Sequence, residues 1–228
     1  MTSEQVVLET QKRAAAAEAV RFVKPGTVIG LGTGSTARYF IDLLGSAVRD
    51  GLKVRAVATS LKTRELAIAN GIPVIEQADG SIDLAIDGAD EIDPALNCIK
   101  GRGGALLREK IVAHASRTFL LIADDTKLVD RLGRGPVPIE VLPFLWHATS
   151  QAIASLGGRV ELRIGEGKPF QTDNGNLILD TIFPALDAQL AEALHGIPGV
   201  IEHGLFYGIA KAAIIGGPRG VRTLGRLP

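Results

Sequence analysis

Acidic and basic side chains are concentrated in one stretch of the sequence, from Asp87 to Lys110. The stretch holds nine charged residues among four glycines and a proline. Carboxylates and an ammonium group that converge in one loop shift each other's pKa values, so that one carboxylate can accept a proton while the lysine stays positive. Glycine N–H groups can in addition bind an oxyanion. These residue types suit proton transfer with charge stabilisation, although a solvated, turn-rich loop has a similar composition.

The place of this stretch in the chain favours the catalytic interpretation. It follows directly after the apolar run Ile82–Ile86, which predicts a buried strand. In open parallel sheets, ligands bind beyond the ends of the strands, where the loops begin. We therefore expect a catalytic site in the loop that begins at Asp87.

A second glycine-rich turn follows the first predicted strand, Thr27–Leu31. The turn reads Gly-Thr-Gly-Ser-Thr-Ala at positions 32–37, and a helical pattern follows it. Free N–H groups at the start of a helix, together with the helix dipole, favour an anion. The hydroxyl groups of Thr33, Ser35 and Thr36 can also donate to the oxygens of a phosphate monoester. The turn is therefore predicted to bind a phosphate group.

The same turn also matches the dinucleotide-binding form G-x-G-x-x-A, through Gly32, Gly34 and Ala37. That form requires an acidic residue at the end of the second strand, where it binds the ribose hydroxyls. The second predicted strand, Val54–Ala58, is followed by Thr59-Ser60 and no acid. The sequence therefore favours a phosphate monoester over a nicotinamide cofactor, which stays an alternative.

Strand and helix patterns alternate along residues 1–130, which predicts a mostly parallel, Rossmann-like sheet covered by helices. The predicted strands are Thr27–Leu31, Val54–Ala58, Ile72–Ile75, Ile82–Ile86 and Thr118–Ala123. The predicted helices are Glu4–Val23, one through Tyr39 and Leu44, Leu61–Asn70, and Ala105–Ser116. Lys12 lies on the first helix, and Lys127 follows the last strand at the same edge of the sheet as the other loops.

The pattern changes after residue 130. Strands are predicted at Val137–Val141, Arg159–Ile164 and Val200–Phe206, a hairpin at Gln171–Asp180, and helices at Ala148–Leu156 and Pro184–Leu194. Hairpin-paired strands with two helices indicate a compact α+β unit of the ferredoxin-like kind. We predict that residues 131–206 form this smaller lid or assembly domain. Residues 1–130 and 207–228 then form the larger α/β domain, which the strand after Lys211 rejoins.

Composition limits the partners that this chain can have. Lys plus Arg and Asp plus Glu both number 25. The formal net charge is therefore zero, which predicts no positive electrostatic field that would attract nucleic acid or an anionic membrane. No run of about 18 apolar residues predicts a membrane span. Cys98 is the single cysteine, which suits the reducing cytoplasm. The four histidines match no metal-ligand spacing, so no metal site is predicted. The four are His114, His147, His195 and His203.

Several separated motifs together resemble those of ribose-5-phosphate isomerase of the A type. The motifs are Gly32-Thr-Gly-Ser-Thr-Ala37, Asp87-Gly-Ala-Asp-Glu91, Lys100-Gly-Arg-Gly-Gly-Ala-Leu-Leu-Arg-Glu-Lys110, Ile122-Ala-Asp-Asp-Thr-Lys127 and Thr172-Asp-Asn-Gly-Asn176. The likeness runs from the first helix to the final strand. It implies an aldose-ketose isomerase that interconverts ribose 5-phosphate and ribulose 5-phosphate without a metal or an organic cofactor. It also implies that the chain forms a homodimer or a homotetramer and binds a sugar phosphate as its small-molecule partner.

The resemblance assigns roles to individual residues. Glu109 is implied as the proton acceptor, and Asp87, Asp90 and Lys100 as the groups around the reacting oxygens. The implied substrate contacts are Lys12, Thr33, Gly34, Ser35, Thr36, Asp87, Gly88, Ala89, Asp90, Lys100, Gly101, Arg102, Gly103 and Lys127. Arg102 stands where many bacterial members have glycine, and it adds a cation beside the expected pocket. A sugar-phosphate sensor without catalytic activity is the remaining alternative. Such a sensor would not need the implied catalytic residues Glu109, Asp87, Asp90 and Lys100.

Overall fold

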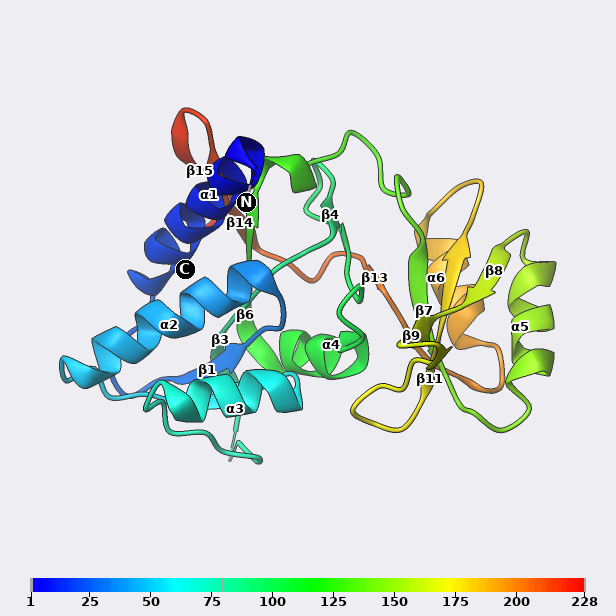
Figure 1. The fold of residues 1–228 in the computed structure, drawn as a ribbon, viewed down its shortest axis with the longest axis horizontal. Helices are drawn as coiled ribbons and strands as arrows, with labels where there is room; N and C mark the ends of the chain where they lie inside the picture. The colour runs from blue at the N-terminus through cyan, green and yellow to red at the C-terminus, as the bar shows by residue number, and fades with distance from the viewer. Residues whose placement is uncertain (1, 79, 228) are drawn as a thin grey trace. The chain divides into compact units, whose positions relative to one another are not determined.

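The computed structural model describes residues 2–78 and 80–227, which form two compact units (Figure 1). The larger unit contains the residues up to Ala89, Arg108–Leu128, and those from Gly208 onward, and the smaller unit contains Asp90–Leu107 and Val129–Tyr207. The sequence-based division assigns residues 90–107 to the larger domain. In the structure they belong to the smaller unit, because β4 (Glu91–Ile92) and β5 (Cys98–Ile99) form an antiparallel sheet with β13 (Leu205–Phe206).

The larger unit is built on a six-stranded sheet in which all neighbouring strands are parallel except β14 and β15, which are antiparallel. Its strands, in spatial order, are β15 (Gly220–Gly225), β14 (Ala212–Gly217), β6 (Ser116–Asp124), β3 (Ile82–Asp87), β1 (Val28–Leu31) and β2 (Arg55–Ala58). The central strands are apolar and buried, as strands of a parallel sheet are. The mostly parallel α/β prediction is confirmed, and the strand after Lys211 does rejoin this sheet.

Helices cover both faces of this sheet because successive side chains of a strand point to opposite sides. Ile29, Leu31 and Ile86 pack into one core with α1 (Ser3–Val20) and α2 (Ser35–Arg49). Gly30 points to the other face, where a Cβ atom would lie 2.5 Å from Val112 of α4 (Leu106–Ala115). Helix α4, which carries Glu109, therefore packs closely against the middle of the sheet.

One predicted strand of the larger unit is wrong. Residues 72–75 form only an isolated bridge, between Val74 and Ala56, after α3 (Leu61–Ala69). The final strand β15 has no counterpart in the sequence-based prediction. Its residues are mostly exposed and carry no continuous apolar pattern, so they gave no strand signal.

The smaller unit has the ferredoxin-like order of elements, β-α-β-β-α-β. They are β7 (Val137–Val141), α5 (Trp146–Ser155), β8 (Arg159–Leu162), β11 (Leu177–Ile182), α6 (Ala188–His195) and β12 (Val200–His203). The strands pair antiparallel in the order β12-β7-β11-β8. Ile153 of α5 and Leu194 of α6 pack with Val137, Ile139 and Leu179, so both helices lie on one face of this sheet.

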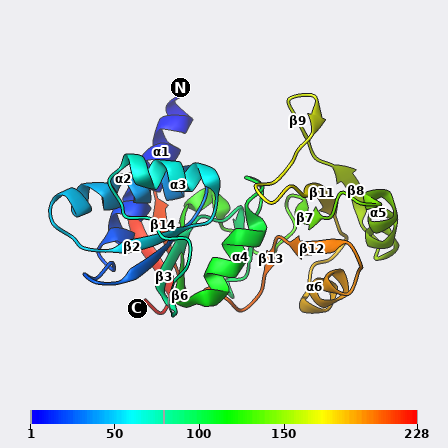
Figure 2. The same cartoon turned by 90° about the horizontal axis from the view of Figure 1, so that it is seen from below.

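Two local predictions in this unit need correction. Helix α6 starts at Ala188 and not at Pro184, because Asp187 caps it by accepting the N–H of Leu190 at 2.8 Å. The predicted hairpin is only a bridge between Gln171 and Leu177, and a separate two-stranded ribbon of β9 (Ile164–Gly165) and β10 (Lys168–Pro169) precedes it. Figure 2 shows this ribbon projecting from the sheet of the smaller unit.

The motif Thr172–Asn176 has a structural partner in the same unit. Glu140 of β7 is fully buried, and its Oε1 accepts hydrogen bonds from the side chains of Thr172, Asn174 and Asn176 at 2.9, 3.1 and 2.8 Å. A buried carboxylate needs such donors to offset its loss of solvation. The motif therefore fixes the turn that leads into β11.

Candidate active site

Asp87 ends strand β3 and is 2% exposed. Its Oδ1 accepts the N–H groups of Thr33 and Gly88 at 3.1 and 2.7 Å. Gly32 gives this carboxylate its space, because a Cβ atom on Gly32 would lie 2.1 Å from the carboxylate carbon. The glycine-rich turn at positions 32–37 and the loop that begins at Asp87 therefore meet at the ends of the adjacent strands β1 and β3. Thr33 and Asp87, which form this contact, are 54 residues apart in sequence.

The hydroxyl of Thr33 is used inside the protein. It lies 2.8, 2.9 and 3.0 Å from the side-chain oxygens of Thr59, Ser60 and Thr63. The glycine-rich turn predicts that this hydroxyl donates to a phosphate, but in the structure its hydrogen bonds tie the turn to the start of α3. Thr59 and Ser60 stand where a dinucleotide site would have its acidic residue, and no motif in the sequence points to Thr63.

The start of α2 keeps the character of an anion site. Gly34 is the N-cap residue with φ of 134°, a backbone conformation that favours glycine, and no side chain caps the helix. Gly34 and Ser35 are exposed, whereas Thr36 is buried. The first N–H groups of an α-helix have no partner within the helix, so they are available to an anion here.

Lys12 is held near α2 by two neighbours in the larger unit. Its ammonium group is 2.7 Å from Glu9 Oε1, and Glu9 Oε2 accepts the hydroxyl of Tyr39, on α2, at 2.6 Å. The hydrogen bond from Lys12, followed by that from Tyr39, holds the pKa of Glu9 below its usual value. Glu9 and Tyr39 are not among the predicted site residues, because single residues on helices form no motif that would identify them.

Glu109 lies in the first turn of α4 and is 4% exposed. It shares the buried side of the helix with Leu106 and Ala113, whereas Ile111 is 57% exposed. The positive end of the helix dipole favours a negative charge at this position. Lys127, in the larger unit as well, ends the short 3-10 helix η1 (Asp125–Lys127), which Asp124 caps.

The smaller unit holds the other expected residues. Lys100 is 2% exposed, its backbone N–H donates to Gly204 at 2.9 Å, and its ammonium nitrogen lies 5.7 Å from the centre of the Phe206 ring. Asp90 accepts the backbone N–H of Arg102 at 3.0 Å. The expected contacts Gly101, Arg102 and Gly103 thus form one loop with Lys100 and Asp90.

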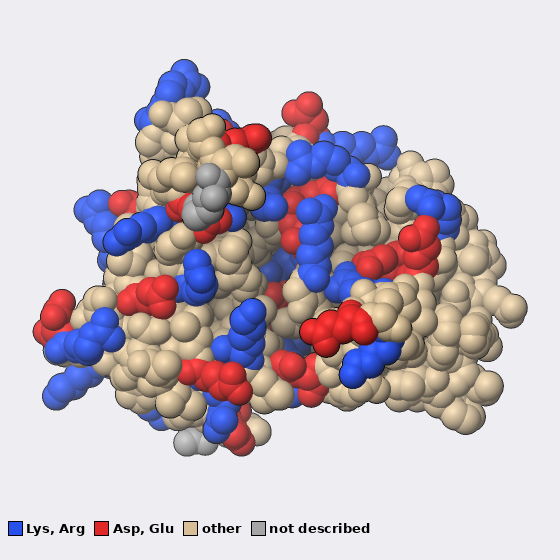
Figure 3. All heavy atoms as spheres, in the orientation of Figure 1, with Lys and Arg blue, Asp and Glu red and all other residues tan. Residues whose placement is uncertain are grey.

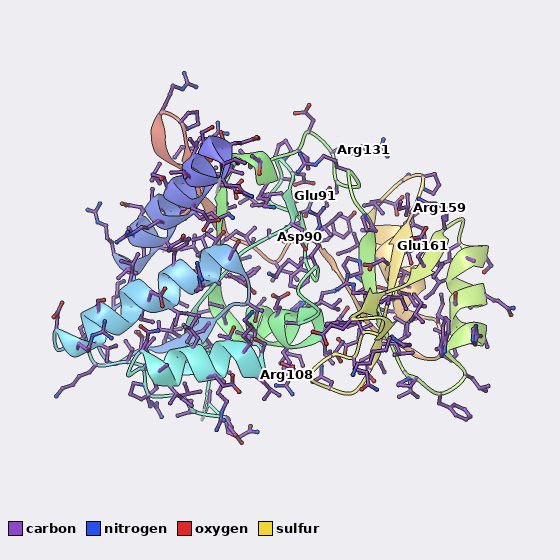
Figure 4. All side chains as sticks on the ribbon, in the orientation of Figure 1. Asp90, Glu91, Arg108, Arg131, Arg159 and Glu161 are labelled. Atoms are coloured by element: carbon purple, nitrogen blue, oxygen red, sulfur yellow. The ribbon has the colours of Figure 1, made fainter. Side chains whose placement is uncertain are left out.

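Glu91 was not expected in the site, yet it shapes the same region. It is fully buried, and its carboxylate accepts the backbone N–H groups of Gly133, Arg134 and Gly135 at 2.8, 3.1 and 2.6 Å. The guanidinium of Arg102 lies between this carboxylate, at 3.8 Å, and that of Asp90, at 3.9 Å. Figure 4 labels Asp90 and Glu91 side by side at the start of β4.

The structure brings two of the four histidines close to a carboxylate, which their spacing in sequence did not indicate. His195 Nε2 and His203 Nε2 lie 2.9 and 4.0 Å from Glu202 Oε1. The N–H of Leu205 donates to His203 Nδ1 at 3.2 Å, which places the proton of a neutral His203 ring on Nε2. A metal ion would need the lone pair of that nitrogen, so the geometry favours a hydrogen-bonded cluster.

A separate pocket of about 550 Å³ lies in the larger unit. Its walls include Ser60, Arg64 and Glu76, together with Arg108 and Ile111 of α4. Residues 33–36, Asp87 and Glu109 do not line it. We assign no part of the chemistry to this pocket.

Charges of both signs are mixed on the surface, as the balanced composition predicts. On the face shown in Figure 3, basic and acidic side chains are interspersed. Among the described residues, no helix combines the length and hydropathy needed to cross a lipid bilayer.

Comparison with known proteins points to one family over nearly the whole chain. The family model described as Ribose 5-phosphate isomerase A (phosphoriboisomerase A) matches residues 55–220. The chain is 50% identical to ribose-5-phosphate isomerase A of Nitrobacter hamburgensis, over 97% of this chain and 100% of that protein. A solved D-ribose-5-phosphate isomerase in complex with phospho-erythronic acid is 46% identical, with a TM-score of 0.92 over 96% of this chain and 99% of that one. Ribose 5-phosphate isomerase A of Methanocaldococcus jannaschii is 40% identical, with a TM-score of 0.92 and the same two coverages.

Proposed function

The chain belongs to the ribose-5-phosphate isomerase A family, and from this premise we propose that it interconverts D-ribose 5-phosphate and D-ribulose 5-phosphate. The observation that carries the proposal is the burial of three ionisable side chains from its motifs. Asp87, Lys100 and Glu109 are 2%, 2% and 4% exposed. Charged side chains are rarely buried to this extent, and a functional role is a common reason where they are.

Glu109 is the proposed base. The carboxylate removes the proton from C2 of the open-chain aldose, the electron pair forms the C1–C2 double bond, and the C1 carbonyl oxygen becomes negative. The same carboxylate then returns the proton to C1, while the hydroxyl proton of O2 moves to O1 and a carbonyl forms at C2. One base on one face of the sugar completes both transfers.

The other charged residues stabilise the negative charge of the intermediate and transfer the hydroxyl protons. Lys100 and the glycine N–H groups of its loop stabilise the oxyanion of the enediolate, because fixed positive charge in a buried site needs no reorganisation during the reaction. The pair Asp87 and Asp90 moves the hydroxyl protons and opens the sugar ring. No metal ion and no organic cofactor has a role in this scheme.

The phosphate group is the remote handle of the substrate. We assign it to the N–H groups at the start of α2 and the hydroxyls of Ser35 and Thr36, with Lys12 and Lys127 as additional cations. The remaining expected contacts, Gly88 and Ala89, belong to the chain segment that links Asp87 to Asp90. Fixing the phosphate orients the reacting carbons over the base.

Replacing Ser35 by alanine is expected to raise KM for ribose 5-phosphate about tenfold with little change in kcat, because one hydrogen bond to a charged group is worth about 1.5 kcal/mol. Steady-state kinetics measure both constants. Ser155→Ala, at an exposed serine of α5, is the matched control. Unchanged KM in Ser35→Ala would remove this hydroxyl from the phosphate site.

We further propose that the chain acts in the cytoplasm as a homodimer or homotetramer, in the non-oxidative branch of the pentose phosphate pathway. The segment before α5 supports assembly, since Leu142, Phe144 and Leu145 are 42%, 74% and 65% exposed. Adjacent exposed apolar side chains mark interaction surfaces. Leu145 also has a φ of 50°, a conformation that is unfavourable for leucine.

Replacing Phe144 by aspartate is expected to shift the oligomer towards monomers, because a charge at a buried contact is costly. Sedimentation velocity of parent and variant at equal concentration measures this. A variant mass equal to that of an oligomeric parent would show that the contact lies elsewhere.

A ketose assay tests the proposed function. Purified protein is mixed with ribose 5-phosphate, with and without a strong chelator, and ribulose 5-phosphate is quantified. Equal ketose formation in both samples supports the proposal. Binding without ketose formation would indicate a sensor, and a change in NADH fluorescence on mixing would indicate a nicotinamide enzyme.

A further inference from the structure

Arg163 makes four side-chain hydrogen bonds in the smaller unit. Its Nε and Nη2 donate to the two carboxylate oxygens of Asp180 at 2.8 and 2.5 Å. Its Nη1 donates to the carbonyl oxygens of Gly101 and Arg102 at 2.9 and 3.0 Å. The side chains of Arg163 and Asp180 are 14% and 23% exposed. One guanidinium thus joins a carboxylate to the glycine loop that follows Lys100.

The register of the sheet explains why Asp180 lies under this loop. Asp180 of β11 is directly opposite Pro138 of β7, so both side chains point to the same face. Helices α5 and α6 cover the opposite face of the sheet, which carries Val137 and Leu179. A Cβ atom on Gly101 would lie 3.2 Å from Pro138. The helix-free face of the sheet therefore supports the glycine loop.

The peptide group between Gly101 and Arg102 connects Arg163 to a proposed catalytic carboxylate. In a trans peptide the C=O and N–H point in opposite directions, and the described residues contain no cis peptide. The carbonyl of this peptide accepts from Arg163, and its N–H donates to Asp90 Oδ2 at 3.0 Å. Hydrogen bonds in such a chain polarise one another. Asp180, Arg163, one peptide group and Asp90 form a continuous hydrogen-bonded series.

Phe170 fixes the same loop from another side. The guanidinium carbon of Arg163 lies 5.7 Å from the centre of the Phe170 ring, and the N–H of Phe170 donates to the carbonyl of Arg163 at 2.9 Å. The ring fills the space beside Gly104, where a Cβ atom would lie 2.4 Å from it. The loop is thus held between this ring, the guanidinium and the sheet.

We propose that Arg163, oriented by Asp180, is a positioning residue that acts through the Gly101–Arg102 peptide to hold the Asp90 carboxylate in its reactive orientation. The proposal rests on the isomerase function and deepens it. Arg163 meets no reacting atom in this account. Its planar fork is required, because a lysine has no geometry that joins both Asp180 oxygens and both carbonyls.

The test is a double-mutant cycle. Arg163→Met is expected to lower kcat about 30-fold to 100-fold in the parent, since small displacements of a catalytic group can cost about that much. In an Asp90→Asn background the same substitution is expected to lower kcat less than about threefold, because the group that Arg163 positions is already lost. KM for ribose 5-phosphate should change less than about threefold, since the phosphate site lies on α2.

The controls separate positioning from stability. Arg159→Met removes a similar ion pair on the neighbouring strand β8, where Arg159 and Glu161 are 2.6 Å apart and both 67% exposed (Figure 4). It is expected to keep kcat within about twofold, as surface pairs contribute little. Arg163→Lys keeps the charge and should remain folded by circular dichroism, yet lose kcat to nearly the same extent as Arg163→Met.

Three results would overturn the proposal: kcat of Arg163→Lys within threefold of the parent, an equal kcat loss from Arg163→Met in both backgrounds, or an equal loss in Arg159→Met. The parent enzyme reports on the proposed function separately. If the parent forms no ketose from ribose 5-phosphate, the function fails. If the parent is active and the Arg163 variants match it, only the positioning role fails.

Discussion

Glu109→Gln is expected to lower kcat by about 10³-fold, because the amide cannot accept the proton from C2 and general-base catalysis contributes about 10² to 10⁴. The variant should still bind ribose 5-phosphate within about threefold of the parent affinity, since the phosphate contacts stay intact. Steady-state kinetics and calorimetric titration measure the two quantities. The substitution keeps the size of the buried side chain, so packing around Leu106 and Ala113 should change little.

A second buried glutamate provides the control for Glu109. Glu140→Gln also removes a fully buried carboxylate, but it lies in the smaller unit and keeps an oxygen for the side chains of Thr172 and Asn176. Its kcat should stay within about threefold of the parent value, because its role is structural. If Glu109→Gln retains more than a tenth of the parent turnover, Glu109 is not the base.

Lys100→Met should lower kcat by about 10²-fold to 10³-fold, which is the usual cost of removing one stabiliser of an oxyanion. KM should change less, because the charge develops only in the transition state. Stopped ketose assays at saturating ribose 5-phosphate measure the effect. The reason is local: the Lys100 ammonium is the buried cation on the loop that also holds Asp90.

Lys110→Met is the matched control, because Lys110 is 5% exposed and is the neighbour of Glu109 on α4. Both variants remove a buried positive charge and both should lose stability, which thermal unfolding reports. Only Lys100→Met should lose about two orders of magnitude in kcat. Equal kcat losses in the two variants would mean that charge burial in general, and not oxyanion stabilisation, explains the effect.

The sequence predicted the larger unit well because its strands are buried on both faces. Val28–Leu31 carries no polar side chain, and Ile82–Asp87 is apolar except at Asp83 and at Asp87, which ends it. Short strands gave no comparable signal. β4, β5 and β13 have two residues each, so no alternation can be read from them. The pairing of β13 with β5, which groups residues 90–107 with the smaller unit, joins residues that are more than a hundred positions apart.

A motif predicts candidate site residues from the sequence, whereas partners that are distant in sequence give no such signal. The burial of Asp87 and Glu109 agrees with the chemistry expected of their motifs. The hydroxyl of Thr33 was expected at a phosphate, but Thr59, Ser60 and Thr63 occupy it, because β1 and β2 are neighbours. Arg163 is 62 residues from Gly101, and only the sheet register brings them together.

The most direct test of the central claim, that one carboxylate moves hydrogen between C1 and C2 while the start of α2 holds the phosphate, is a crystal structure of this protein with phospho-erythronic acid. The phosphate is expected on the N–H groups of Ser35 and Thr36. The Glu109 carboxylate is expected within about 3.5 Å of the carbons that correspond to C1 and C2. A phosphate bound away from α2, or a Glu109 side chain out of reach of those carbons, would contradict the account.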